Sequence, residues 1–335
     1  MAVNRMGMLL WRSERIDAEG IARFAREAEG AGFDELWIPE TWVREAGIQL
    51  ALAAQATERI RLGSGIFNIY GRSPGLLAQT AAEIDVLSGG RFDLGLGVSG
   101  PAVIENWHAQ PFDRPLRRSR EVVAALRMAL AGERVNLAGE TVRMEGFRLR
   151  RKPVQERLPI YLAANGPDNT RLTGEIADGW IPHFVPFSRT EESIAPLAEG
   201  AARAGRALAE VDVAPFVFTA PDDNVGRARE RVKPSIAFYI GAMGDYYHAQ
   251  LTRYGYGEAA DAIRAGWKRG GRAAAAREVP DDLVDDLALC GPLPRIAEGL
   301  DRLRGAGVTH PILRILEDVE EGETAGLLEG LGKLR

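Results

Sequence analysis

The chain has 335 residues, of which 46% are hydrophobic and 27% charged, and its formal net charge is −5. This acidic balance disfavours general nucleic-acid binding, which needs a basic surface, and no apolar run approaches the ~20 residues of a membrane-spanning helix. The single cysteine, Cys290, cannot form an internal disulfide, and four scattered histidines predict no metal site. Residues 1–11 lack a long apolar region, so we recognise no signal peptide and expect a cytoplasmic location.

The first part of the chain alternates apolar strands with amphipathic helices. Residues 6–11 predict a strand, and residues 17–32 predict a helix in which Ile21, Phe24 and Ala28 share one face. Further strands are expected at residues 34–39, 59–66 and 91–98, and further helices at 47–57, 73–88 and 115–132. Strands this apolar on both faces are typical of a buried parallel sheet.

Two segments interrupt the alternation. Residues 133–150 alternate in polarity around a turn at Ala138-Gly139 and predict a β-hairpin, and a long helical stretch fills the region near 221–290. Between and after them, strands are expected at residues 158–164, 179–185, 210–220 and 310–315, and helices at 169–178, 189–205 and 292–307. Eight strand-helix steps without a Pro/Ser-rich linker predict a single α/β domain over residues 1–335, a (β/α)8 TIM barrel with two insertions.

The stretch "GLGVSG", Gly95 to Gly100, fits the G-x-G-x-x-G spacing of a dinucleotide-binding turn. That turn must open a helix, whereas Pro101 follows here and residues 100–115 are interpreted as a loop. The spacing is therefore interpreted as the end of the fourth barrel strand.

Parallel barrels carry their chemistry on the loops after the strands. The corresponding loops here include residues 39–42, 64–68, 97–100, 164–167 and 182–184. They contain glycine, aromatic and small polar residues that would suit a flat ring against the backbone. None of them supplies a nucleophile with its base.

Several of these segments resemble one family. "AEGAGFDELWIPET", the run from Thr57 to Gly100, "LPIYLAANGPDNTRLTGEIADGW" and "CGPLPRIAEGLDRL" are similar to the bacterial luciferase-like superfamily, and within it to the branch that uses coenzyme F-420. The overall pattern resembles methylene-tetrahydromethanopterin reductases. The resemblance implies a homodimer or higher homo-oligomer, and it leaves out residues 221–285.

The resemblance also implies a cofactor site. It consists of Ser64, Gly65, Ile66, Asn68, Gly97, Val98, Ser99, Ala164, Asn165, Gly166 and Pro167. A non-prolyl cis peptide at Gly65-Ile66 would back the deazaflavin ring, although Gly65 could instead be an ordinary bulge glycine. The phosphate would lie on the backbone of Asn165 and Gly166, at the start of a helix whose Asp168 carboxylate must turn away. The plainer alternative is a helix start capped by Asp168 or Asn169.

Glu40 and Thr41 stand where the family carries an acidic residue and often a histidine, so they are the candidate catalytic pair. Absence of the histidine favours substrate reduction. Glu40 would hydrogen-bond the cofactor or protonate the product, or it would only pair with a nearby arginine. Trp107 and His108 are interpreted as surface or packing residues, with a place on the substrate side as the alternative. The tyrosines of the long insertion are interpreted as packing or an oligomer interface.

Together these features predict an enzyme in which coenzyme F-420 exchanges a hydride with a small organic substrate, of pterin, enone or imine type. The alternatives are an FMN-dependent monooxygenase, an NADH-dependent methylene-tetrahydrofolate-type reductase and a non-catalytic flavin-binding barrel. No nucleic-acid or membrane partner is expected.

Overall fold

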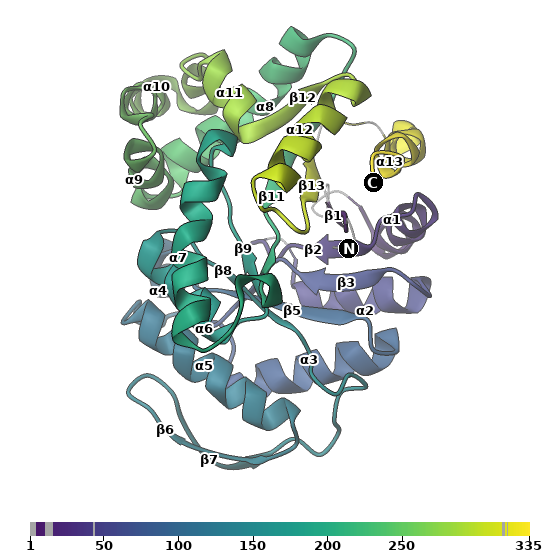
Figure 1. The fold of residues 1–335 in the computed structure, drawn as a ribbon, viewed down its shortest axis with the longest axis vertical. Helices are drawn as coiled ribbons and strands as arrows, with labels where there is room; N and C mark the ends of the chain where they lie inside the picture. Colours follow the sequence, from purple (N-terminus) through teal and green to yellow (C-terminus); the bar gives the residue numbers. More distant parts are fainter. Residues whose placement is uncertain (1–4, 11–15, 43, 317–318, 320) are drawn as a thin grey trace.

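A curled parallel β-sheet forms the centre of the molecule (Figure 1). The computed structural model describes residues 5–10, 16–42, 44–316, 319 and 321–335. Across the sheet, the hydrogen-bonded neighbours lie in the order β10-β9-β8-β5-β3-β2-β1-β13-β11-β12, and β4 pairs with β5. Their bounds are β1 Gly7–Leu9, β2 Glu35–Ile38, β3 Arg61–Ser64, β4 Phe67–Asn68, β5 Phe92–Gly97, β8 Ile160–Ala163, β9 Gly179–Ile181, β10 Asp212–Val213, β11 Phe216–Pro221, β12 Ala288–Gly291 and β13 Ile312–Ile315.

The sheet closes where β10 leads into β11. β10 pairs with β9 and β11 pairs with β13, with only Ala214 and Pro215 between β10 and β11. The Ala214 N–H donates to the Trp180 carbonyl at 2.8 Å, and the Pro215 carbonyl accepts from Ile312 at 2.9 Å. One bent strand therefore bonds to both neighbours, which confirms the predicted (β/α)8 barrel.

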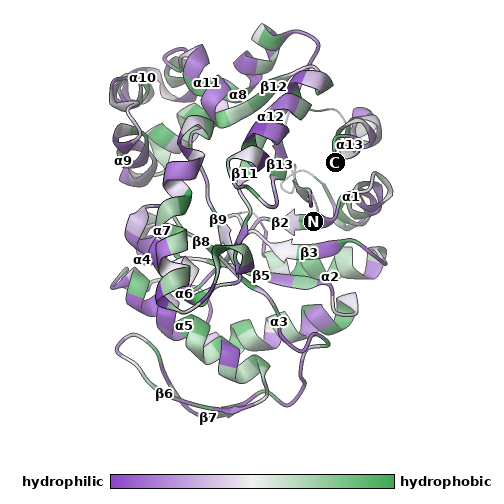
Figure 2. Ribbon diagram, viewed as in Figure 1, coloured by the Kyte–Doolittle hydropathy of each residue, from purple (hydrophilic) through white to green (hydrophobic). Residues whose placement is uncertain are grey.

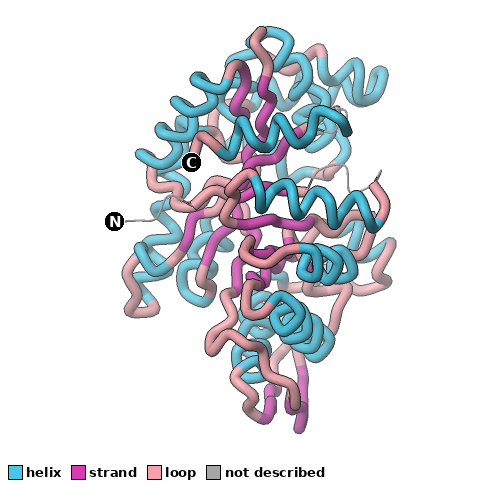
Figure 3. The backbone as a smooth tube through the Cα atoms, turned by 90° about the vertical axis from the view of Figure 1, so that its right-hand side faces the viewer, coloured by secondary structure: helices cyan, strands magenta, loops and turns pink. Residues whose placement is uncertain are grey.

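Helices cover the outside of the barrel (Figure 3). Their bounds are α1 Ala18–Gly30, α2 Ala46–Ala56, α3 Pro74–Ser88, α5 Pro115–Leu130, α6 Pro167–Ile176, α7 Thr190–Arg203, α12 Leu293–Gly305 and α13 Thr324–Gly332. Asp17 and Ser73 cap the starts of α1 and α3, and Gly89 ends α3 in the left-handed conformation. Apolar and polar residues alternate along helices such as α5 (Figure 2), as expected for a helix with one face on a core. None of the described helices is long and apolar enough to cross a membrane.

Large side chains fill the inside of the barrel. Trp37 from β2 meets Tyr161 from β8 edge to face with ring centroids 5.2 Å apart, and Phe216 from β11 at 6.0 Å. Gly63 makes room for this layer, because a Cβ there would lie 2.4 Å from the Trp37 ring. The interior is therefore a packed core, and ligands must bind above it at the ends of the strands.

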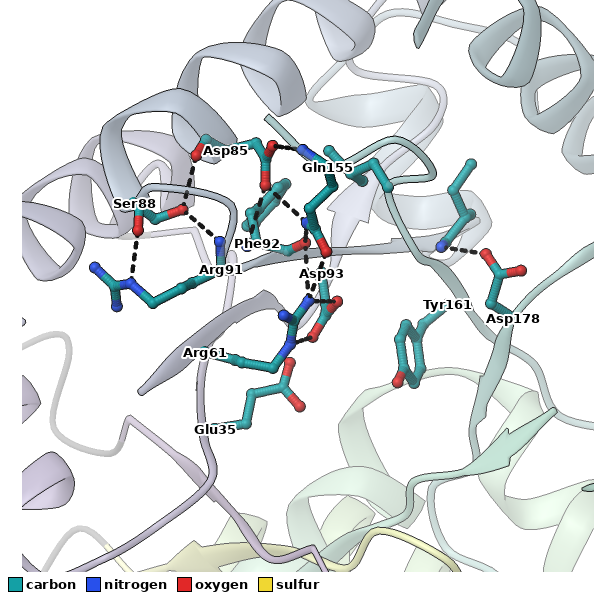
Figure 4. A network of polar contacts seen from close by, with 12 residues as sticks. Glu35, Arg61, Asp85, Ser88, Arg91, Phe92, Asp93, Gln155, Tyr161 and Asp178 are labelled. Atoms are coloured by element: carbon teal, nitrogen blue, oxygen red, sulfur yellow. Dashed lines mark hydrogen bonds and ion pairs between the residues drawn. The ribbon is translucent and has the colours of Figure 1, made fainter. Parts of the chain in front are cut away.

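Below this layer, at the beginnings of the strands, lies a polar cluster (Figure 4). Arg61 donates through Nε to Asp93 at 2.8 Å and through Nη2 to Gln155 at 3.2 Å. Gln155 in turn donates to Asp85 at 2.7 Å. These bonds link β3, β5 and α3 to the segment that leads into β8.

Residues 133–150 form a hairpin that projects from the barrel (Figure 1). Its strands, β6 Arg134–Ala138 and β7 Arg143–Arg148, are antiparallel. Glu121 of α5 holds the turn, since its carboxylate accepts the backbone N–H groups of Glu140, Thr141 and Val142 at 2.8–3.0 Å and the Thr141 hydroxyl at 2.6 Å.

The second interruption is a bundle of helices at the other end of the molecule (Figure 1). It consists of α8 Val225–Ala242, α9 Asp245–Arg253, α10 Gly257–Ala276 and α11 Asp281–Leu287. The helical stretch predicted near 221–290 ends at Leu287, and β12 follows instead of helix. Phe218 of β11 pairs with Ala288, and all four β12 residues are buried, so sheet pairing replaces helix there.

Residues 100–115 also differ from the loop interpretation. A short helix, α4 Pro101–Asn106, follows β5. Pro101 occupies its first turn, where the missing N–H costs nothing and the fixed φ favours a helix. The proline thus begins this helix instead of preventing it.

Candidate active site at the barrel mouth

The third strand ends in the bulge that the resemblance implied. The Gly65-Ile66 peptide is cis, and β4 then resumes the pairing, with Asn68 opposite Gly97 of β5. Ser64 bridges the break, since its Oγ donates to the Gly95 carbonyl and accepts the Gly95 N–H, both at 2.9 Å. Ser64 is fully buried, so its side chain joins two strands and does not face the mouth.

Ile66, Asn68 and Ser99 line one cleft at this mouth. Gly97 lies directly behind Ile66, because a Cβ on Gly97 would come 2.6 Å from the Ile66 Cδ1 atom. Asn68 is nearly buried, and its Oδ1 accepts the Tyr70 and Gly71 N–H groups at 2.7 and 3.2 Å. Ser99 is exposed and has φ +58°. Val98 is half-buried against the core.

Residues 164–167 lie beside this cleft, because β8 pairs with β5 and places Ala163 opposite Gly97. Gly166 precedes α6 with φ +85°, a conformation that favours glycine, and no side chain caps the helix. Pro167 is its first residue. Asp168 turns outward, since its carboxylate is 78% exposed and accepts from Arg171 at 2.7 Å. The start of α6 therefore carries backbone N–H groups without a facing carboxylate.

The Ala164 carbonyl and the Asn165 side chain join this loop to the neighbouring β9 segment. The Ala164 carbonyl accepts from the Trp180 indole N–H at 2.8 Å. The Asn165 amide nitrogen lies 3.1 Å from the Ala164 carbonyl oxygen and 3.2 Å from that of His183. Asn165 thus joins the β8 and β9 loops, which leaves its backbone, and not its side chain, as the group available for an anion.

Glu40 forms a two-point ion pair at the cleft. Its two carboxylate oxygens accept separately from the two terminal nitrogens of Arg72, which also bonds Glu45. Both partners are mostly buried, with 17% of the Glu40 and 11% of the Arg72 side chain exposed. The pairing with an arginine agrees with the second interpretation of Glu40, and its catalytic role stays a prediction. Thr41 lines the cleft next to it.

The cleft contains further residues beyond the candidate cofactor and catalytic residues. Its volume is about 1450 Å³, and it extends along α2 and α3 to the hairpin. Near the mouth it is lined by Trp42, Arg72, Trp107, His108 and Met243. His108 packs on Gly71, where a Cβ would meet its ring at 2.7 Å. The position of Trp107 and His108 in a loop after the fourth strand could have indicated a place at the mouth. No local pattern indicates Met243, which comes from the helical insertion.

A second group of rings closes the neighbouring part of the mouth. His183 contacts Phe184 and Tyr239 at centroid distances of 4.8 Å, and Tyr247 lies 4.9 Å from Tyr239. Burial, aided by the charge of Arg314, lowers the pKa of His183 to about 3. His183 is therefore neutral at physiological pH and serves packing, as do the two tyrosines.

The comparisons with known proteins agree with this geometry. The family model described as Luciferase-like monooxygenase matches residues 5–310. The chain belongs to this family. A protein of Mycobacterium tuberculosis, provisionally named a coenzyme F-420-dependent oxidoreductase, is 35% identical over 87% of this chain and 89% of its own. A 5,10-methylenetetrahydromethanopterin reductase of Methanolobus tindarius is 31% identical over 87% and 88%.

A solved structure extends the likeness of this luciferase-like barrel to three dimensions. The coenzyme F-420-dependent tetrahydromethanopterin reductase of Methanopyrus kandleri superimposes with a TM-score of 0.87 at 27% identity and covers 99% of this chain and 98% of its own. The chain is therefore an enzyme of the luciferase-like family whose homologues are named F-420-dependent oxidoreductases.

Proposed function

We propose that this enzyme uses coenzyme F-420 to transfer a hydride to or from an electrophilic carbon of a small organic substrate. The observation that carries the proposal is the mouth itself, where Ile66, Asn68 and Ser99 share one cleft beside the uncapped start of α6. The names of the relatives support the choice of coenzyme.

The residues present fit such a coenzyme. Gly97 leaves Ile66 room to present a flat apolar surface to a ring, and the exposed backbone at Ser99 borders the same space. The N–H groups at the start of α6 suit a phosphate, because they carry partial positive charge and Asp168 points away. When bound, the coenzyme supplies the hydride.

Reduction of a conjugated substrate also needs one proton for each hydride. Glu40 and Glu45 are both paired with Arg72. His108 lines the cleft and is exposed, and we assign it the proton transfer to the substrate atom adjacent to the one that takes the hydride. His108→Asn should lower kcat at least tenfold while leaving the Kd of F-420 within twofold. A kcat close to that of the wild type would remove His108 from this role.

The cofactor is tested by binding titrations with F-420, FMN and NADH. We expect the tightest binding for F-420 and sustained turnover with reduced F-420 on enones, imines or pterins. Micromolar FMN binding without F-420 binding would favour the monooxygenase alternative. F-420 binding without any turnover over this panel would favour a non-catalytic barrel.

We also propose that two copies associate through α2 and α3 and that the enzyme acts in the cytoplasm. Ile48 of α2 and Leu76 of α3 are 67% and 49% exposed, although they are large and apolar, and Leu87 continues the same face. A face of this kind is typical of a protein interface. Sedimentation velocity tests it, and a monomer at micromolar concentration contradicts the proposal.

A further inference from the structure

Two tryptophans stand on the wall of the cleft with half of their surface exposed. Trp42 follows β2 and Trp107 follows α4, and each is 56% exposed. Their rings meet edge to face, with centroids 5.9 Å apart and planes at 81°. Both line the cleft that contains Ile66 and Ser99. Indole rings are usually mostly buried, so two exposed rings at the cofactor mouth are not explained by packing.

The helical insertion supports this pair. Phe238 of α8 lies 6.1 Å from the Trp42 ring. Phe238 itself is held by Trp267 of α10, at 6.1 Å, and by the Arg272 guanidinium, 4.8 Å above its ring. The back of Trp42 is therefore fixed by α8 and α10, while its exposed part faces the cleft. This gives the insertion a role at the mouth of the barrel.

We propose that Trp42 and Trp107 form an aromatic corner that binds a flat, conjugated, electrophilic ring as the substrate. Two rings at 81° leave the face of one and the edge of the other toward a ligand. A flat ring in such a corner makes one offset-stacked and one edge-to-face contact, the two arrangements that aromatic groups prefer. The electron-rich indole faces favour an electron-poor ring, and such a ring is also the type that accepts a hydride.

The surroundings of the corner agree with an uncharged ligand. The nearby carboxylates of Glu40 and Glu45 are both paired with Arg72, and Met243 adds an apolar side chain. The cleft continues from the corner to Ile66 and Ser99, so a ring bound at the corner lies beside the proposed cofactor site. This inference rests on the proposed function and adds the class of substrate to it.

The test compares one bicyclic and one monocyclic acceptor, menadione and 2-cyclohexen-1-one, with reduced F-420. For Trp42→Ala and for Trp107→Ala, we expect KM for menadione to rise about tenfold, which corresponds to ~1.4 kcal/mol, and KM for cyclohexenone to change less than threefold. Trp42→Phe and Trp107→Phe should restore most of the affinity. The Kd of F-420 should stay within twofold in every variant. Val154→Ala, which truncates an exposed apolar residue elsewhere, is the control.

A second measurement separates this inference from the proposed function. Calorimetric binding of menadione in the absence of coenzyme needs no turnover, and it should be lost in both alanine variants. If the wild type binds menadione in this way but never turns over with reduced F-420, the corner stands and the proposed function falls. Equal KM changes for both acceptors would overturn the corner. Loss of dimers without any change in KM would also overturn it, because the two rings would then serve an interface between copies.

Discussion

Single residues set the shape of the cofactor side of the mouth. Gly97 and Ile66 show this best, because the space occupied by the Ile66 side chain exists only where Gly97 has no Cβ. The residue is a glycine inside a buried strand, a position where glycine weakens the sheet unless something approaches closely.

Gly97→Ala should therefore weaken both F-420 binding and the fold. The added Cβ would displace Ile66, the residue that backs the proposed ring, and we expect the Kd of F-420 to rise about tenfold while unfolding free energy falls by roughly 1–3 kcal/mol. Fluorescence titration and urea unfolding measure the two effects. Gly100→Ala is the matched control, since a Cβ there meets nothing within 4 Å. Equal Kd values in the two variants would contradict the assignment of Ile66.

At the scale of elements, the hairpin depends on one carboxylate. Burial alone would raise the pKa of Glu121, but hydrogen bonds from the Thr141 hydroxyl and from three backbone N–H groups outweigh it and lower the pKa to about 2. The native state thus binds the Glu121 proton less tightly than the unfolded chain does. This contribution to stability is present above the ordinary glutamate pKa and is lost as the pH falls toward 2.

Glu121→Gln should release the hairpin without opening the barrel. An amide cannot accept these bonds as a carboxylate does, so we expect a loss of roughly 1–3 kcal/mol at pH 7 and a smaller difference from wild type near pH 3. Urea unfolding at both pH values measures this. Hydrogen exchange should increase first in β6 and β7. A constant difference at the two pH values would show that the charge of Glu121 does not matter.

The order of elements could be predicted from the sequence because it is a local property. The helical period over residues 17–32 and the apolar runs of the strands each lie within one segment. The two missed elements depended on context. The helix α4 was missed because Pro101, which begins it, was taken to indicate a loop. The strand β12 was missed because it forms by pairing with β11, which is distant in the sequence.

The site could be predicted only in part, because its pairs are distant in sequence. The resemblance indicated Gly65 and Ile66, whose peptide is cis, and the alternative of an arginine partner for Glu40 was open. That partner, Arg72, is 32 positions away, and no local pattern identifies it. The same is true of Trp42 and Phe238, which meet only because the insertion folds over the mouth.

The two ends of the barrel differ in the kind of residues they hold. The mouth holds the candidate site, while the opposite end of the barrel buries the polar cluster of Figure 4. There Glu35 of β2 is fully buried and faces Asp93 and Arg61, with His310 Nδ1 3.3 Å from its Oε2. Arg5, Tyr161 and Asp212 complete the group of charges and titratable side chains around it. The strands begin at this end of the barrel, away from the loops that carry the chemistry, so we expect these charges to affect stability and not catalysis.

Glu35 should make the stability of the barrel depend on pH. Burial, followed by the negative charge of Asp93, raises the pKa of Glu35 well above its ordinary value, while Arg61 and Arg5 oppose the shift. Burial and the charge of Arg5 lower the pKa of His310 to about 3, so this histidine adds no positive charge near neutrality. The native state therefore retains a proton that the unfolded chain releases above the ordinary glutamate pKa. The stabilisation is complete below that pKa and is lost as the pH rises through the higher, folded-state value.

Glu35→Gln removes this titration and keeps the shape of the neutral acid. We expect wild type to lose stability relative to the variant as the pH rises from 5 to 9, with a slope of at most ~1.4 kcal/mol per pH unit, the value for one proton. Urea unfolding at each pH measures the difference. Glu121→Gln provides the internal control, because its difference from wild type should change at low pH and in the opposite direction. Parallel curves for wild type and Glu35→Gln between pH 5 and 9 would mean that Glu35 is charged in the folded barrel, balanced by Arg61 and Arg5.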